Sequence, residues 1–99
     1  MAIHMTMDLP VSRADIEAVS NAMGVRDDVP DGLILHVAFD LPEGGIRIVD
    51  VWESQKHFES FRDSRLNPTL GKVLPERGIE MDGPPPDPQY SEVYDLVHG

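Results

Sequence analysis

Residues 32–66, GLILHVAFDLPEGGIRIVDVWESQKHFESFRDSRL, contain the pattern that decides the fold. Residues 32–39 are apolar apart from His36, which is typical of a strand covered on both faces. A turn sequence rich in proline and glycine fills residues 41–45, and residues 46–52 form a second apolar stretch. Because the connection is short, the two stretches are predicted to pair as an antiparallel hairpin.

A helix is predicted directly after the hairpin. Ser54 can cap its first turn, because a serine hydroxyl accepts a hydrogen bond from a backbone N–H there. Phe58, Phe61 and Leu66 recur at helical spacing, which indicates one buried side. Asn67–Pro68 is predicted to bend or end this helix, with one or two further turns beyond it.

One strand and one helix are predicted before the hairpin. Residues 2–8 alternate between apolar and polar side chains, as strand residues do. Ser12 is the predicted N-cap of the helix, and Asp15 lies in the first turn, where a negative charge suits the helix dipole. Gly24 is the predicted C-terminal stop. Residues 25–31, which include three aspartates and a proline, are expected to form a loop.

The last part of the chain completes the element order. Residues 83–88 include four prolines and are expected to form a surface connection. Residues 90–98 return to a strand pattern. The order is therefore β-α-β-β-α-β, the α+β, ferredoxin-like arrangement. We expect an antiparallel sheet in strand order 4-1-3-2, with both helices on one face.

The length and the strand pattern together predict a dimer. A chain of 99 residues allows one domain, 1–99, with a modest core. Every predicted strand has apolar residues on both faces, and the helices cover only one face of the sheet. Because exposing the other face to water is unfavourable, we expect a homodimer that packs sheet against sheet.

Charge and composition exclude several functions. The formal net charge is -10, from 18 acidic and 8 basic residues, so binding to nucleic acid or to an anionic membrane surface is not expected. The absence of cysteine excludes disulfides, thiol catalysis and cysteine zinc sites. No apolar run approaches the roughly 20 residues that span a bilayer, and residues 1–10 lack the features of a secretory signal. A cytoplasmic location is the expectation.

The hairpin and the helix after it resemble a known family. Residues 51–54, Val-Trp-Glu-Ser, followed by a helix with Phe58 and Phe61, are similar to the dimeric α/β-barrel superfamily, and more narrowly to antibiotic-biosynthesis-monooxygenase-like domains. The resemblance implies a homodimer and, among other activities, cofactor-free oxidation. The haem-degrading branch has a tryptophan and a haem-ligating histidine where this chain has Phe61 and Gly71, so haem degradation is not expected.

His36 and Asp50 are the predicted catalytic residues. If the hairpin loop has five residues, Asp40 pairs with Ile46 and His36 faces Asp50; a four-residue loop pairs Asp40 with Gly45 and separates the two side chains. In the first register Asp50 can orient the imidazole and raise its basicity, as a general base requires. The alternative is a hydrogen-bonded core histidine without chemistry.

The other predicted site residues belong to a substrate pocket. Ala38 leaves space above the sheet for a flat apolar ligand, and Ile34 is expected to share that face. Trp52 either forms a wall of the pocket or serves as a packing anchor. The full set of predicted substrate-binding residues is Trp52, Phe58, Phe61, Ala38, His4 and Arg65.

Two of these residues have alternative interpretations. His4 could join a pocket with His36 or lie in the dimer interface. Arg65, like Arg62, could hold an anionic group or pair with an acidic neighbour. A metal site from His4, His36 and Asp50 is conceivable, but no spacing supports it, so neither a metal nor a cofactor is expected.

Three functions fit these residues. The first is cofactor-independent oxygenation, or a related proton transfer, on a small aromatic or polyketide-like molecule, with His36 as base. The second is non-catalytic binding of a small hydrophobic ligand in the same pocket. The third is a structural or interaction module without a pocket. Whether the protein is an enzyme is left open by the sequence.

Overall fold

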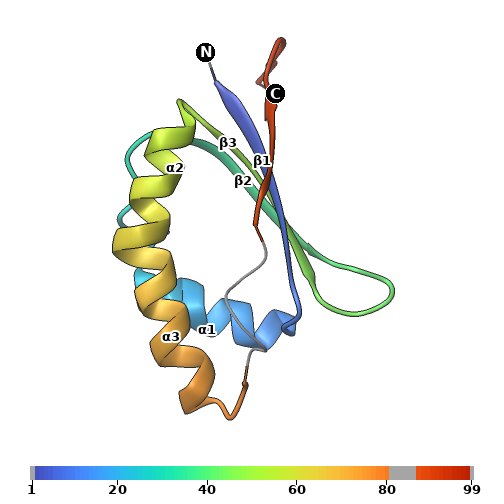
Figure 1. The fold of residues 1–99 in the computed structure, drawn as a ribbon, viewed down its shortest axis with the longest axis vertical. Coiled ribbons are helices and arrows are strands. Elements are labelled where there is room, and N and C mark those ends of the chain that lie inside the picture. Colours follow the sequence, from blue (N-terminus) through green and yellow to red (C-terminus); the bar gives the residue numbers. More distant parts are fainter. Residues whose placement is uncertain (1, 81–86, 99) are drawn as a thin grey trace.

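The computed structural model describes residues 2–80 and 87–98. It is an α+β fold in which the predicted strands and helices follow one another in the predicted order (Figure 1). The elements are β1 Ile3–Leu9, α1 Arg13–Met23, β2 Leu33–Asp40, β3 Ile46–Trp52, α2 Gln55–Phe61, the π-helical segment η1 Arg62–Leu66, α3 Asn67–Glu76 and β4 Gln89–Glu92.

The sheet has the predicted topology. Its four strands run in the order β2-β3-β1-β4, and every neighbouring pair is antiparallel. The helices all lie on one side of the sheet (Figure 1). This side therefore carries the core, and none of the described helices lies over the opposite side of the sheet.

The ends of α1 are fixed by its capping residues. Ser12 and Asp15 form a reciprocal capping box, in which each side chain accepts a hydrogen bond from the other residue's backbone N–H. Gly24 ends the helix in the left-handed conformation, with φ of 69°. Both ends of this helix confirm the prediction from sequence.

The second helical stretch is longer than predicted. Segments α2, η1 and α3 follow one another without a break, so Asn67–Pro68 does not end the helix. Pro68, which has no backbone N–H, lies in the first turn of α3, directly after the π-helical segment η1. The irregularity lies upstream, where the Asn67 backbone N–H donates to the carbonyl of Arg62 in a π-helical turn.

The core lies between the helices and one face of β1 and β3. Its side chains come from alternate strand positions and from the inner sides of the helices, which is the pattern expected of an amphipathic sheet under helices. The most fully buried large side chains are Met5, Leu9, Val19, Ile46, Trp52, Phe58 and Leu74.

Residues 32–39 are predicted to be covered on both faces, by the helices and by a second copy of the chain; in the single chain described, one of these faces is exposed. Strand β2 is an edge strand, and Leu35, Val37 and Phe39 are each more than two-fifths exposed, at 44%, 42% and 45%. These three side chains share the face opposite His36, because successive strand residues alternate between faces. The strand is apolar on a face that the protein's own helices do not reach.

The fourth strand is shorter than predicted. It ends at Glu92, which lies opposite Ile3, the first residue of β1. One more hydrogen bond joins the Val93 backbone N–H to the carbonyl of Ala2, and the residues that follow have no β1 residue to pair with. Tyr94 is consequently 98% exposed. Of the predicted proline-rich connection, residues 83–86 lie outside the described part of the chain.

The described helices are too short or too polar to cross a membrane.

Candidate functional site

The hairpin adopts the first of the two predicted registers. Asp40 lies opposite Ile46, and His36 lies opposite Asp50. Within the loop, the Leu41 backbone N–H donates to the Gly45 carbonyl over 3.0 Å, which closes a five-residue connection. His36 and Asp50 therefore project from the same face of the sheet, the face that the helices cover.

Asp50 joins His36 and Trp52 through hydrogen bonds to its two carboxylate oxygens. The Oδ1 atom lies 2.6 Å from His36 Nδ1, and Oδ2 accepts a 3.1 Å hydrogen bond from Trp52 Nε1. Asp50 is 4% exposed and is the one buried polar or charged residue among those described. A buried carboxylate needs such partners, because desolvation without them is costly.

His36 is more exposed than the sequence suggested. Its side chain is 45% exposed, whereas that of Asp50 is only 5% exposed. The imidazole is therefore half-buried rather than enclosed, because β2 lies at the edge of the sheet. The Asp50 carboxylate is buried, and the imidazole that contacts it is partly exposed to solvent.

The surroundings of His36 favour its protonated form. The hydrogen bond that His36 donates to Asp50 raises the pKa of His36, and the negative charge of that carboxylate raises it further. Burial acts in the opposite direction, as does the positive charge of Arg26. The net direction is upward, which makes the imidazole a stronger base than a free histidine.

A cavity of about 200 Å³ opens beside this group; we call it the inner cavity. It lies between the sheet and the helical layer, and its lining is mostly apolar. Its polar lining comes from Ser20, Arg26, His36, Asp50 and the N–H of Trp52. The apolar lining residues include Met5, Met7, Ile16, Met23, Leu33, Ala38, Ile48, Phe58, Phe61 and Leu66.

The inner cavity brings together most of the predicted pocket residues. Ala38 lies opposite Ile48, and both line the cavity as expected. Ile34 does not, because a bulge shifts the register between Leu33 and Leu35 and leaves Leu33 opposite Trp52. Leu33 takes the position on the cavity face that the sequence pattern assigned to Ile34.

Trp52 combines the two interpretations that the sequence left open. It is 1% exposed and packs against Phe58 and Phe61, with ring centroids 5.6 Å and 5.4 Å away. These contacts anchor α2 to the end of β3, and the same indole lines the inner cavity. Its N–H also meets Asp50, so the anchor fixes the position of the carboxylate.

Two predicted substrate-binding residues lie elsewhere. His4 projects from the opposite face of β1, where its Nε2 lies 2.6 Å from Thr6 Oγ1. The structure thus separates His4 from His36 and Asp50, and the three cannot share one metal ion. Arg65 lies outside the inner cavity; it donates to the Met23 carbonyl over 2.8 Å and lies 3.7 Å from an oxygen of Asp28.

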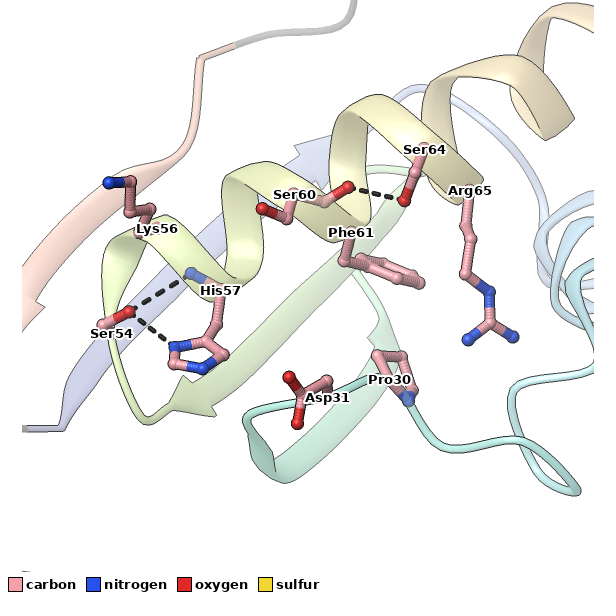
Figure 2. Close-up of a pocket in the computed structure, with 9 residues that line it drawn as sticks. All are labelled: Pro30, Asp31, Ser54, Lys56, His57, Ser60, Phe61, Ser64 and Arg65. Atoms are coloured by element: carbon pink, nitrogen blue, oxygen red, sulfur yellow. Dashed lines mark hydrogen bonds between the residues drawn. The ribbon is translucent and has the colours of Figure 1, made fainter.

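Arg65 instead lines a second, more open hollow of about 460 Å³, which we call the outer pocket. Figure 2 shows the helix of Ser54–Arg65 above it and the segment with Pro30 and Asp31 below. Pro30 and Phe61 line both this pocket and the inner cavity, so they form the partition between the two.

A group of polar side chains that the sequence did not connect lies beside the outer pocket. Ligand atoms of Asp31, Glu53 and His57 all lie within 4.8 Å of one another, although both carboxylates are exposed. His57 Nδ1 lies 2.6 Å from Ser54 Oγ (Figure 2). Nothing in the sequence spacing relates His57 to Asp31, a loop residue far upstream.

Arg26 is the residue of the inner cavity that sequence reasoning missed. It follows Gly24 in the segment read as an acidic loop, and no motif marks it. The sequence offers one indirect signal, which is that Arg26 is the sole basic residue of residues 25–31.

Comparison with known proteins supports the fold. The sequence matches no family model and no curated protein. Among solved structures, a putative antibiotic biosynthesis monooxygenase from Chloroflexus aurantiacus is similar, with 13% identity and a TM-score of 0.64 over 100% of this chain and 98% of that one. Rv0793 from Mycobacterium tuberculosis is 16% identical, with a TM-score of 0.58 over 98% and 96% of the two chains.

A third similar structure has a described activity. A variant of SnoaB, a cofactor-independent oxygenase from Streptomyces nogalater, is 10% identical, with a TM-score of 0.57 over 97% of this chain and 94% of that one. Identities this low establish the shared fold and not a shared reaction. The chain therefore shares its α+β fold with these three structures.

Proposed function

We propose that the protein binds a small aromatic or polyketide-like molecule in the inner cavity and removes a proton from it, with His36 as the base and Asp50 as its orienting partner. The observation that carries the proposal is the His36–Asp50–Trp52 chain of hydrogen bonds at the polar end of an apolar cavity. A titratable group with a perturbed pKa in such a cavity is the usual mark of a functional site.

The hydrogen bonds assign the proton positions. In neutral His36, Nδ1–H donates to the Asp50 carboxylate, so Nε2 is the nitrogen that can accept a proton. When Nε2 takes the proton, the imidazolium is stabilised by the buried negative charge beside it. The Trp52 N–H holds the other carboxylate oxygen, so that Asp50 keeps its orientation throughout.

Proton removal would prepare a suitable substrate for oxidation by dioxygen. An activated methylene group loses a proton to give a carbanion, which is a strong electron donor. Oxidation of the methylene to a carbonyl transfers four electrons to dioxygen; one oxygen atom enters the product and the other leaves as water. Dioxygen is the sole oxidant, and this reaction needs no cofactor. The described activity of SnoaB makes this the first reaction to test.

The size of the cavity limits the substrate. A buried apolar cavity of about 150 Å³ accepts benzene, so the inner cavity of about 200 Å³ suits one or two fused rings without rearrangement. Larger polycyclic molecules would have to project towards the open edge at β2, where His36 is half exposed.

The experiment is turnover of a panel of anthrone-like and quinol substrates by the wild type and by His36→Ala. We expect the substitution to lower kcat/KM by 10²-fold or more, which is the usual contribution of a positioned general base. His57→Gln is the matched control, because His57 lies outside the inner cavity. Equal turnover by wild type and His36→Ala would remove His36 from the reaction.

A non-catalytic ligand-binding protein is the second candidate. The observation that favours it is the apolar lining of the cavity, which binds a hydrophobic molecule whether or not a reaction follows. Tight binding of a substrate-sized molecule by both wild type and His36→Gln, with no turnover by either, would support this alternative.

We also propose that the protein is a homodimer. The support is the face of the sheet that carries Leu35, Val37 and Phe39, each half exposed on an edge strand. Exposed side chains of this kind are more favourable against another apolar surface than against water. A second copy offers the same face, so a two-fold arrangement would bury both.

A further inference from the structure

Arginines in this protein are paired with carboxylates almost throughout. Within residues 2–80 and 87–98, every arginine but one has an acidic side chain at ion-pair distance. The pairs are Arg13–Asp40, Arg47–Asp8, Arg62–Asp63, Arg65–Asp28 and Arg77–Asp15. Such pairing is expected in a chain with 18 acidic and 8 basic residues.

Arg26 is the exception within the described part of the chain. No carboxylate there lies at ion-pair distance from it, although Asp27 and Asp28 follow it directly in the sequence. The Asp28 carboxylate faces Arg65 instead, at 3.7 Å. Arg26, the described arginine without an acidic partner, is also the arginine that lines the inner cavity.

The position of Arg26 relates it to the candidate base. Arg26 and His36 line the same cavity, one from the loop after α1 and the other from β2. The positive charge of Arg26 is the smallest of the influences on the pKa of His36, and it acts against the increase. A ligand beside His36 is therefore within the electrostatic reach of Arg26.

We infer that Arg26 is the anion-recognition residue of the inner cavity and that the ligand is a compact aromatic molecule bearing an acidic group, a carboxylate or an acidic phenol or enol. This inference rests on the proposed function of the cavity. The apolar walls would hold the ring system, and the guanidinium would take the place beside the ligand's anion that an acidic side chain takes at the other arginines.

The chemistry of arginine fits this role. A guanidinium presents planar paired donors that match the two oxygens of a carboxylate, and the charge-assisted hydrogen bonds that it forms are the stronger kind. The remaining lining is mostly apolar and offers few donors to an anion. In a protein with a net charge of -10, an anionic ligand also needs a local positive charge to overcome the general repulsion.

The test uses a matched pair of probes, 2-naphthoate and 2-naphthamide, which have the same ring system and nearly the same shape but differ in charge. Their dissociation constants are measured by isothermal titration calorimetry at pH 7.5 and low salt. For the wild type we expect naphthoate to bind about tenfold more tightly, as a charge-assisted hydrogen bond would provide. In Arg26→Gln that preference should disappear, and in Arg26→Lys part of it should remain.

Two control variants separate the local effect from general ones. Arg77→Gln removes the same charge at a residue that pairs with Asp15 and does not line the cavity, so it should keep the preference for naphthoate. Ala38→Leu partly fills the inner cavity, so it should weaken both probes by a similar factor. That result would locate the probes in the inner cavity rather than in the outer pocket.

The outcomes distinguish this inference from the function on which it rests. Equal affinity of the wild type for the two probes, or a preference for naphthoate that survives in Arg26→Gln, overturns the role of Arg26 and leaves the cavity proposal standing. Binding of neither probe at millimolar concentration, or binding that Ala38→Leu does not weaken, overturns the cavity as a ligand site and the inference with it.

Discussion

At the residue scale, the arrangement depends on one buried carboxylate. Asp50 is enclosed, and its two oxygens are satisfied by His36 and Trp52. The identity of this pair was predictable from the sequence, because a polar residue on each of two apolar strands invites pairing. The contribution of Trp52 was not, since its N–H reaches Asp50 along the same strand, two residues away.

The first prediction concerns Asp50→Asn. The substitution removes the hydrogen bond to an ionised carboxylate, and with it the negative charge, that together raise the pKa of His36, so that pKa should fall towards or below the ordinary value of 6.5. Because an amide cannot satisfy the same two donors equally well, the free energy of unfolding should also drop by about 1–3 kcal/mol. NMR titration of the His36 ring and urea denaturation measure the two effects. A His36 pKa that stays raised in Asp50→Asn would contradict the assigned cause.

The second prediction concerns the pH dependence of stability. The pKa of His36 is raised in the folded protein, so the folded state holds this proton more tightly than the unfolded state does. The resulting stabilisation is fully present below the unfolded pKa of about 6.5 and is lost as the pH rises through the folded pKa. In the wild type, the free energy of unfolding should therefore fall as the pH rises above about 6.5 and through the raised folded-state pKa of His36.

His36→Gln is the control for that pH dependence, because it keeps a polar side chain but does not titrate. Its free energy of unfolding should change less than that of the wild type over the same interval, in urea titrations at a series of pH values. Identical pH profiles for the two proteins would show that folding does not raise the pKa of His36.

At the element scale, the hairpin shows what the sequence could and could not determine. Its two strands and the helix after it follow from apolar runs and a capping serine, and all were predicted. The register was not, because loops of four and five residues both fit the turn sequence. Gly44 and Gly45 both adopt positive φ, 103° and 91°, and allow the five-residue loop. A side chain at Gly45 would come within 2.9 Å of the Leu9 carbonyl oxygen.

Other differences between the predicted and the observed structure also arise from contacts between elements. The end of β4 depends on where β1 begins, and the exposure of β2 depends on which strands the helices cover. The bulge at Leu33–Leu35 changes which residue faces the cavity. None of these features produces a pattern within a single segment of the sequence, so they cannot be predicted from that segment alone.

The third prediction concerns the junction of β2 and α2. Gly32 has φ of 86°, and a Cβ there would lie 2.4 Å from atoms of the His57 ring. Gly32→Ala should therefore lower the free energy of unfolding by more than the roughly 1 kcal/mol that positive φ alone costs. Gly78→Ala is the matched control, with φ of 77° and nothing within 4 Å of the added atom.

Urea denaturation of the two variants measures the difference. We expect Gly32→Ala to be clearly less stable than Gly78→Ala, because the added methyl must displace the imidazole. Equal losses in both variants would mean that the His57 ring moves aside freely and that Gly32 is required only for its backbone conformation.

At the scale of the whole molecule, the uneven cover of the sheet is the main feature. The helices occupy one side of the sheet (Figure 1). Leu35, Val37 and Phe39 remain half exposed on the other side. The sequence predicted apolar residues on both faces correctly, but a single chain buries only one. In the proposed dimer, the second face forms the interface between the two copies.

The fourth prediction tests that dimer. Val37→Asp places a charge in the middle of the exposed apolar face and should shift the protein from dimer to monomer, because burying an unpaired carboxylate is costly. Val29→Asp makes the same change at an exposed valine outside the sheet and should leave the assembly unchanged. Native mass spectrometry gives the masses directly. A wild type that is monomeric at micromolar concentration would remove the dimer from the account.

The central claim is that His36 acts as a base on a ligand in the inner cavity. Its most direct test is deuterium exchange into the methylene group of anthrone in D2O without oxygen, since this isolates proton transfer from oxidation. The account predicts that the wild type and His57→Gln accelerate the exchange above the rate in buffer and that His36→Ala does not. Acceleration by His36→Ala equal to that by the wild type would contradict it.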